Sequence, residues 1–309
     1  MPTRAEIQKI INERKGGAQD EVRRSYLANA AKISKRDTIL YASGWTSPKR
    51  HEGVPPNFLS LVIEDIQGFM AALHGLEGDK LDLIIHSPGG SLEAVDQVVQ
   101  YLRGKYSHVR AIVPQNAMSV ACMLACACDE IVMGKQSALG PIDPQLSWNS
   151  SQGAVSAAAQ SLLDELDAAK KDIGANPNLA PIWATRLKGF PPGIFATCKT
   201  TMELSESKVS EWLSKYMFKS EPESAKPNEI SSWLASATIH KTHGRPIGFE
   251  LCKEKGLKVF RLEDDQKFQD AILSVFHASA VTFEVTSCIK IIESHKGRGH
   301  YVTIQHNKK

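Results

Sequence analysis

Short apolar runs alternate with amphipathic segments through the first half of the chain. Residues 81–85 form a mainly apolar, β-branched run, which is typical of a buried strand. The apolar positions that follow recur at helical spacing, at Leu92, Val95, Val98, Val99 and Leu102. Residues 109–113 then form a second strand-like run. Strand, helix and strand in this order predict a right-handed parallel crossover and therefore an α/β fold.

The same pattern repeats directly afterwards, because the second strand leads through a short loop to Ser119. Residues 120–128 contain no charged residue and are apolar on every side, which predicts a buried helix. The first N–H groups of a helix have no partner within it and carry a partial positive charge. Ser119 therefore lies where a hydroxyl can be activated or an oxyanion held. The commoner role of a serine at this position is that of an N-cap.

A tight turn follows the first strand at Ser87, Pro88, Gly89 and Gly90. Glycine adopts positive φ at little cost and lets bare backbone approach a ligand. The turn is thus a candidate oxyanion hole, and a plain strand-to-helix turn is the alternative interpretation.

Periodicity predicts further elements outside this region. Helices are expected at residues 5–12, 21–33, 57–73, 249–255 and 265–277, and strands at 38–42, 257–261, 281–285 and 301–305. Residues 155–216 are expected to be mostly helical, with Ser205 as an N-cap. Residues 219–228 are expected to form an exposed loop because they contain Pro222 and Pro227.

Composition narrows the class of protein. A chain of 309 residues that is 42% hydrophobic can bury a substantial core, and its net charge of +3 is too small to indicate a nucleic-acid partner. No run reaches the roughly 18 apolar residues of a membrane span, and residues 1–20 lack a signal-peptide core. We therefore expect a cytoplasmic protein without a membrane anchor. The six cysteines lack zinc-ligand spacing, so neither a metal nor another cofactor is expected.

Several blocks in one order resemble the serine dehydrogenase proteinase family. They are the Ser-Pro-Gly-Gly turn at 87–90, Ala-Met-Ser at 117–119, and the runs at 127–134 and 137–145. That family belongs to the Clp protease/crotonase superfamily and is related to signal peptide peptidase A. The resemblance is strong over about residues 38–145 and recovers over 232–262, where Gly244-Arg245 and Gly256-Leu257 are similar to an element that closes the peptidase domain.

The resemblance implies a Clp protease/crotonase-like core, a repeated ββα spiral with helical additions. We expect a helical arm at residues 1–36, a peptidase domain at 37–285 with a helical insertion at about 150–236, and a C-terminal strand and tail at 286–309. It also implies a homo-oligomer whose active sites face an enclosed space. The expected partners are then a polypeptide substrate and further copies of the chain.

The activity implied is that of a serine peptidase acting on unfolded proteins or peptides through a Ser119 acyl-enzyme. The N–H groups of Gly90 and Val120 would hold the oxyanion. Val120-Ala121 departs from the small residues, such as Ala-Gly, of the relatives, and the β-branched Val120 narrows the pocket.

The sequence offers several candidates for the general base. Clp-type enzymes have a histidine shortly after the serine, whereas this chain has Asp143 there, interpreted as a turn residue. Signal peptide peptidases use a buried lysine of lowered pKa. Lys199 is favoured for this role because its neighbourhood is uncharged. The alternatives are Lys170, Lys171, Lys188, His86, His240 and His243.

Two other functions fit the same fold. A crotonase-like acyl-CoA enzyme would use the paired N–H groups to stabilise an enolate and would not need Ser119. A non-catalytic oligomeric scaffold would need neither a nucleophile nor a base.

Overall fold

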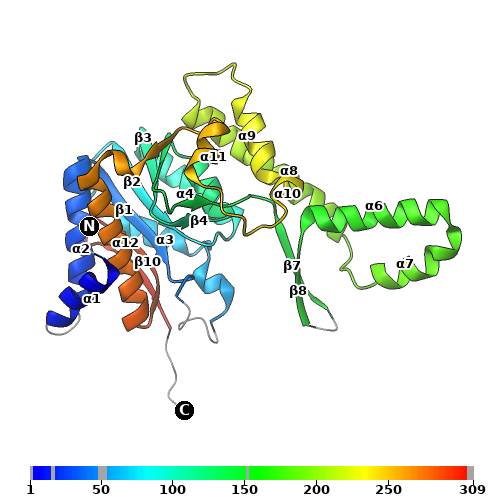
Figure 1. Ribbon diagram of the computed structural model, residues 1–309, viewed down its shortest axis with the longest axis horizontal. Helices are drawn as coiled ribbons and strands as arrows, with labels where there is room; N and C mark the ends of the chain where they lie inside the picture. The colour runs from blue at the N-terminus through cyan, green and yellow to red at the C-terminus, as the bar shows by residue number, and fades with distance from the viewer. Residues whose placement is uncertain (1–2, 15–17, 48–53, 151–152, 305–309) are drawn as a thin grey trace, which may run out of the picture.

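A seven-stranded mixed sheet forms the centre of the molecule in the computed structural model, which describes residues 3–14, 18–47, 54–150 and 153–304 (Figure 1). In spatial order its strands are β11 (Gly299–Thr303), β10 (Cys288–Ser294), β1 (Asp37–Ser43), β2 (Lys80–His86), β3 (His108–Val113), β5 (Glu130–Met133) and β9 (Val259–Arg261). The five strands from β1 to β9 are parallel, whereas β10 pairs antiparallel with β1 and also with β11. The predicted α/β class and the parallel crossover between β2 and β3 are confirmed.

Helices cover both faces of this sheet. One face carries α2 (Ala18–Ser34) and α12 (Gln266–Val285), against which α1 (Arg4–Glu13) packs. The other face carries α3 (Asp65–Leu73), α4 (Leu92–Lys105) and α5 (Val120–Cys126). Side chains alternate between the faces, so that in β1 Leu40 packs with the α2 and α12 residues whereas Ile39 and Tyr41 pack with the others. All seven residues of α5 are buried, as its uncharged sequence predicts.

A small parallel pair, β4 (Asn116–Ala117) and β6 (Ala138–Leu139), joins the loops above the sheet. The chain then leaves the core as a hairpin, β7 (Gln145–Ser150) and β8 (Gly153–Ala158), followed by α6 (Ala159–Ala175) and α7 (Ala180–Leu187). These four elements extend away from the central sheet and are called the projection below (Figure 1). The return path is α8 (Ile194–Trp212), α9 (Lys226–Ala235), α10 (Ala237–His240) and α11 (Phe249–Glu254). Short helical turns lie at Pro56–Leu59, Pro177–Leu179, Leu213–Met217 and Leu262–Asp264.

Three expectations about helices are corrected. The helix expected at 57–73 is divided into the turn Pro56–Leu59 and α3, because Leu61 leaves the helical path and forms a bridge with Gly90. Ser205 is buried inside α8, which begins at Ile194, so it is not an N-cap. The loop after α8 is shorter than expected, since α9 begins at Lys226.

The expected strands also differ. Residues 281–285 continue α12, because Ala278 and Val281 recur at helical spacing and pack together against α1 and α2. β10 and the β7–β8 hairpin were not predicted, whereas the last strand is present as β11; Gln305 lies outside the described residues. β10 pairs with β1 and therefore joins the C-terminal segment to the central sheet. None of the helices in the described ranges has the length and apolar character needed to cross a membrane.

His86 ends β2 on the face that α12 covers. Its ring stacks on Trp45 at 5.8 Å and meets Phe276 of α12 edge-on at 5.0 Å, between ring centroids. Within the described residues its buried Nδ1 has no hydrogen-bond partner. Burial lowers the pKa of His86 from 6.5 to about 4, so the ring is neutral in the folded protein at pH 7.

Acid is therefore expected to destabilise the protein through His86. The unfolded chain binds a proton below its pKa of 6.5 while the folded ring resists protonation down to about 4, so stability falls across this interval. Between pH 7 and pH 5 the free energy of unfolding should fall by about 2 kcal/mol more in the unmodified protein than in His86→Phe. Urea unfolding at both pH values measures this difference, and equal losses would contradict it.

Candidate active site

The two motifs that the sequence singles out lie side by side. The N–H of Ser87 donates to the carbonyl of Asn116 at 3.1 Å, and the N–H of Met118 donates to the carbonyl of Ser87 at 3.0 Å. These backbone bonds join the end of β2 to the loop that precedes α5. The Ser-Pro-Gly-Gly turn is thereby placed directly against Ser119.

Close backbone contacts explain both glycines of this turn. Gly89 and Gly90 have φ of 110° and 155°. A Cβ on Gly89 would lie 2.8 Å from the Cβ of Ser119, and one on Gly90 would lie 2.0 Å from the carbonyl oxygen of Leu61. No side chain fits at either position, so the turn brings bare backbone to the start of α5.

Ser119 itself has an unusual backbone. Its φ of 51° and ψ of −123° are rare for a residue with a side chain, and such a conformation costs on the order of 1–3 kcal/mol. Although Ser119 is the N-cap residue of α5, its side chain makes no capping hydrogen bond. The commoner role of a serine at a helix start is therefore not the role of this hydroxyl.

Two N–H groups beside Ser119 are available to a ligand. In the described part of the chain, the N–H groups of Gly90 and Val120 donate to no backbone carbonyl. Both residues line, with Ser119, a cavity of about 290 Å³. The apolar part of its wall comes from α4, α5, the loop after β6 and α8, through Leu92, Met123, Ile142 and Leu204. A carbonyl bound there can meet a hydroxyl and two backbone donors at once.

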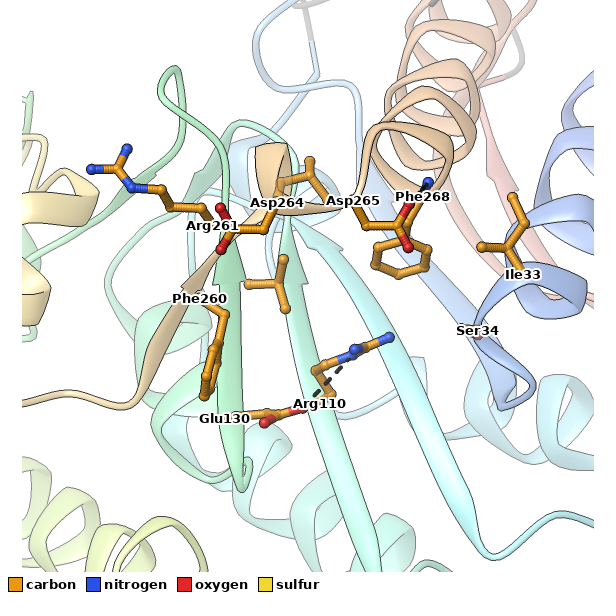
Figure 2. A pocket seen from close by; sticks show the side chains of 11 residues that line it. Ile33, Ser34, Arg110, Glu130, Phe260, Arg261, Asp264, Asp265 and Phe268 are labelled. Carbon is orange, nitrogen blue, oxygen red and sulfur yellow. Dashed lines mark hydrogen bonds and ion pairs between the residues drawn. The ribbon is translucent and has the colours of Figure 1, made fainter.

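A larger cavity, of about 420 Å³, lies on the opposite face of the sheet between α2, β9 and α12 (Figure 2). Its basic groups already have partners, since Arg110 binds Asp82 at 2.8 Å and Arg261 binds Glu250. It contains none of the predicted site residues. The cavity at Ser119 is therefore the candidate active site despite its smaller volume.

Lys199 is not brought to Ser119. It lies on α8 with an exposed side chain. The pKa of Asp167 on α6 is lowered mainly by the hydrogen bond and charge of Lys170 and to a smaller degree by the charge of Lys199. The residues of α8 that reach the cavity are Thr201, Leu204 and Ser205. Lys199 as general base stays a prediction, and this geometry does not favour it.

Two of the alternative histidines are held elsewhere. His86 packs on α12, on the face of the sheet opposite to α5. His240 is buried, with its Nε2 2.8 Å from the carbonyl oxygen of Trp233, and burial lowers its pKa. Neither lines the cavity.

His243 is joined to the cavity wall through a carboxylate. Its Nδ1 lies 2.9 Å from Oδ1 of Asp143, and the two side chains are 30% and 6% exposed. Asp143 follows Ile142 and precedes Pro144, both of which line the cavity. Its other oxygen accepts from Nε2 of Gln145 at 2.8 Å, which fixes the carboxylate. The sequence offers no local signal for this pair, because its members are 100 positions apart.

Nothing among the described residues indicates a metal centre, since no group of three or more His, Cys, Asp or Glu side chains is arranged to hold an ion. The six cysteines are all buried and unbridged. Burial raises the pKa of Cys252 to about 12, and that of Cys128 to about 12, so these thiols are poor nucleophiles. Of the residues that the structure describes, no cysteine lines the cavity at Ser119.

Comparison with known proteins matches part of the chain to a family of serine proteinases. Residues 52–172 match the family described as ClpP-like SDH-type serine proteinase. Uncharacterized protein MJ0137 of Methanocaldococcus jannaschii is 37% identical over 113 residues, which are 36% of this chain and 40% of that protein. Uncharacterized protein MJ1495 of the same organism is 37% identical over 92 residues, which are 29% of this chain and 32% of that protein. The similarity thus spans less than half of either relative.

The matched segment holds the serine and both candidate oxyanion donors, Gly90 and Val120, together with Asp143. Lys199 and His243 lie beyond it. The similarity of this chain to the ClpP-like SDH-type serine proteinase family therefore covers the segment that holds Ser119.

Proposed function

We propose that this protein is a serine peptidase that hydrolyses peptide bonds in unfolded proteins or peptides. One observation carries the proposal: the uncapped Ser119, in a strained turn, shares a cavity with the free N–H groups of Gly90 and Val120. Serines with a strained backbone at strand-to-helix turns are typical of nucleophiles.

The reaction follows from these groups. Ser119 Oγ attacks the scissile carbonyl, and the carbonyl oxygen, as it becomes an oxyanion, accepts hydrogen bonds from Gly90 and Val120. One such donor contributes about 3 kcal/mol to transition-state stabilisation. The amine product leaves, and water then hydrolyses the ester on Ser119, which restores the hydroxyl.

We assign the proton transfers to His243, oriented by Asp143. A carboxylate on Nδ1 favours the tautomer whose Nε2 accepts a proton, and it stabilises the imidazolium that forms. The assignment requires Nε2 to reach Ser119 Oγ directly or through one water when substrate is bound. Lys199 is the alternative base, and it would need α8 to move or a second copy of the chain to supply it.

The expected substrate is an extended polypeptide. Ser119 is half-buried at the wall of the cavity, so a folded substrate would have to release a segment to reach it. The walls from Leu92, Met123 and Leu204 suit apolar side chains.

We also propose a homo-oligomeric assembly and a repeated ββα topology. A homo-oligomer is supported by exposed apolar residues on the projection, including Ile182 at 66% exposure. We interpret β3, β4 and α5, which follow one another in the chain, as one unit of a repeated ββα spiral. A cytoplasmic location stays a prediction.

Covalent labelling tests the nucleophile. A fluorophosphonate probe should form one adduct on the native protein, and mass spectrometry should locate it on Ser119. The same preparation should cleave an unfolded, fluorophore-labelled protein, and prior labelling should stop the cleavage. Absence of both adduct and cleavage would overturn the proposal; binding of a coenzyme A thioester in the same preparation would then favour the crotonase-like enzyme.

A further inference from the structure

A buried ion pair lies beside the backbone segment that contacts the Ser-Pro-Gly-Gly turn. Lys290 of β10 and Asp65 at the start of α3 have side chains that are 1% and 2% exposed. Lys290 Nζ lies 2.9 Å and 3.0 Å from the two carboxylate oxygens. Burying two charges costs desolvation that their attraction often fails to repay, so the stability of the fold alone does not explain this pair.

The pair holds the chain on both sides of Leu61. Lys290 Nζ donates to the carbonyl of Ser60 at 2.6 Å, and the N–H of Val62 donates to Oδ2 of Asp65 at 3.2 Å. The backbone of Leu61 between them is thereby fixed against β10.

Leu61 in turn holds the glycine turn. Its N–H donates to the carbonyl of Gly89 at 2.7 Å, and its carbonyl accepts from the N–H of Ser91 at 2.9 Å. These two bonds lie on either side of Gly90, whose Cα packs against the Leu61 backbone. The direction of the Gly90 N–H thus depends on where Leu61 is held.

A further contact to Asp65 comes from Tyr41 of β1. Its hydroxyl donates to Oδ2 of Asp65 at 2.9 Å, the same oxygen that accepts from the N–H of Val62. Tyr41 therefore holds the carboxylate that fixes the backbone beside Leu61.

We propose that Lys290, Asp65 and Tyr41 are positioning residues that aim the Gly90 N–H at the oxyanion. The inference rests on the proposed peptidase function. A donor improves the transition state only when it points at the developing charge, and small displacements of such groups cost activity. Anchoring through a buried charge pair supplies the rigidity that a bare glycine backbone lacks.

Tyr41→Phe tests the support of the Asp65 carboxylate with little disturbance, because the ring keeps its stacking on Phe69 and Asp65 keeps Lys290 and the Val62 N–H. Tyr106→Phe is the matched control. The Tyr106 hydroxyl is also buried and donates to a carboxylate, Oδ2 of Asp37 at 3.0 Å, but it has no connection to the turn.

We expect Tyr41→Phe to lower kcat by about 10- to 100-fold while KM changes by less than about twofold, because a misdirected donor affects the transition state and not substrate binding. Tyr106→Phe should leave both constants within about twofold. A purely structural role for Tyr41 would make the two variants alike.

Hydrogen exchange gives a readout that does not depend on activity. Peptides covering residues 87–92 should exchange faster in Tyr41→Phe than in the unmodified protein or in Tyr106→Phe, with the rest of the sheet unchanged. Unchanged exchange and unchanged kcat in Tyr41→Phe would overturn this inference while Ser119 labelling still stood. Failure of the unmodified protein to label or to cleave would instead count against the proposed function, and the exchange result would still decide whether the network positions the turn.

Discussion

Ser119→Ala is expected to lower kcat for an unfolded substrate by on the order of 10⁴- to 10⁶-fold, the largest effect of any single substitution in this chain. The substitution removes the attacking oxygen and leaves Gly90 and Val120 in place, so substrate should still bind. Fluorescence-monitored cleavage under saturating substrate measures the loss. Binding of the substrate, followed by anisotropy, should be preserved.

Ser119→Gly separates the hydroxyl from the strain of its backbone. Glycine adopts the positive φ of 51° at little cost, so this variant should be more stable than Ser119→Ala, by about 1 kcal/mol, yet equally inactive. Full activity in either variant would exclude Ser119 as nucleophile. It would also direct attention to the enolate chemistry that the paired N–H groups can support.

His243→Ala is expected to lower kcat by about 10³- to 10⁴-fold, and Asp143→Asn by a similar factor, because the first removes the base and the second its orienting charge. Lys199→Ala should retain activity within about twofold, as expected of an exposed lysine outside the cavity. Initial rates of peptide cleavage measure all three.

His74→Ala, at an exposed histidine on the C-terminal end of α3, is the control for nonspecific effects of removing an imidazole. The combined variant of His243 and Asp143 should lose little more than His243→Ala alone, because residues that act as a unit are not additive. If Lys199→Ala is inactive and His243→Ala is active, the base is Lys199, brought to Ser119 by movement of α8 or supplied by a second copy of the chain.

The secondary structure could be predicted where one periodicity governs a segment. The β3 strand and the buried α5 helix follow directly from their apolar runs. The hairpin of the projection could not, since β7 alternates only between exposed and half-buried positions. β10 was not predicted because it contains Lys290 and Glu293, which are charged and therefore indicate an exposed segment. Both are buried in the structure, paired with Asp65 and Arg23.

The residues of the site could likewise be predicted from the sequence only in part. Gly90, Ser119 and Val120 lie in short motifs whose local geometry is encoded nearby, and the structure brings them to one cavity. The identity of the general base depends on which segment, far away in the sequence, lies beside the cavity. An uncharged neighbourhood suggested that Lys199 is buried, but α8 turns Thr201 and Leu204 inward and leaves Lys199 in solvent.

The projection affects how the candidate active site responds to heat. Its small apolar cluster, built around Leu162, Ile194 and Cys198, is separate from the core around the sheet. α8 enters both clusters, because Cys198 belongs to the first and Val209 and Trp212 to the second. Such a satellite unit can open locally while the main core stays folded. Opening of the projection on heating should therefore loosen the wall that α8 supplies at Thr201 and Leu204 while the core around Ser119 stays folded.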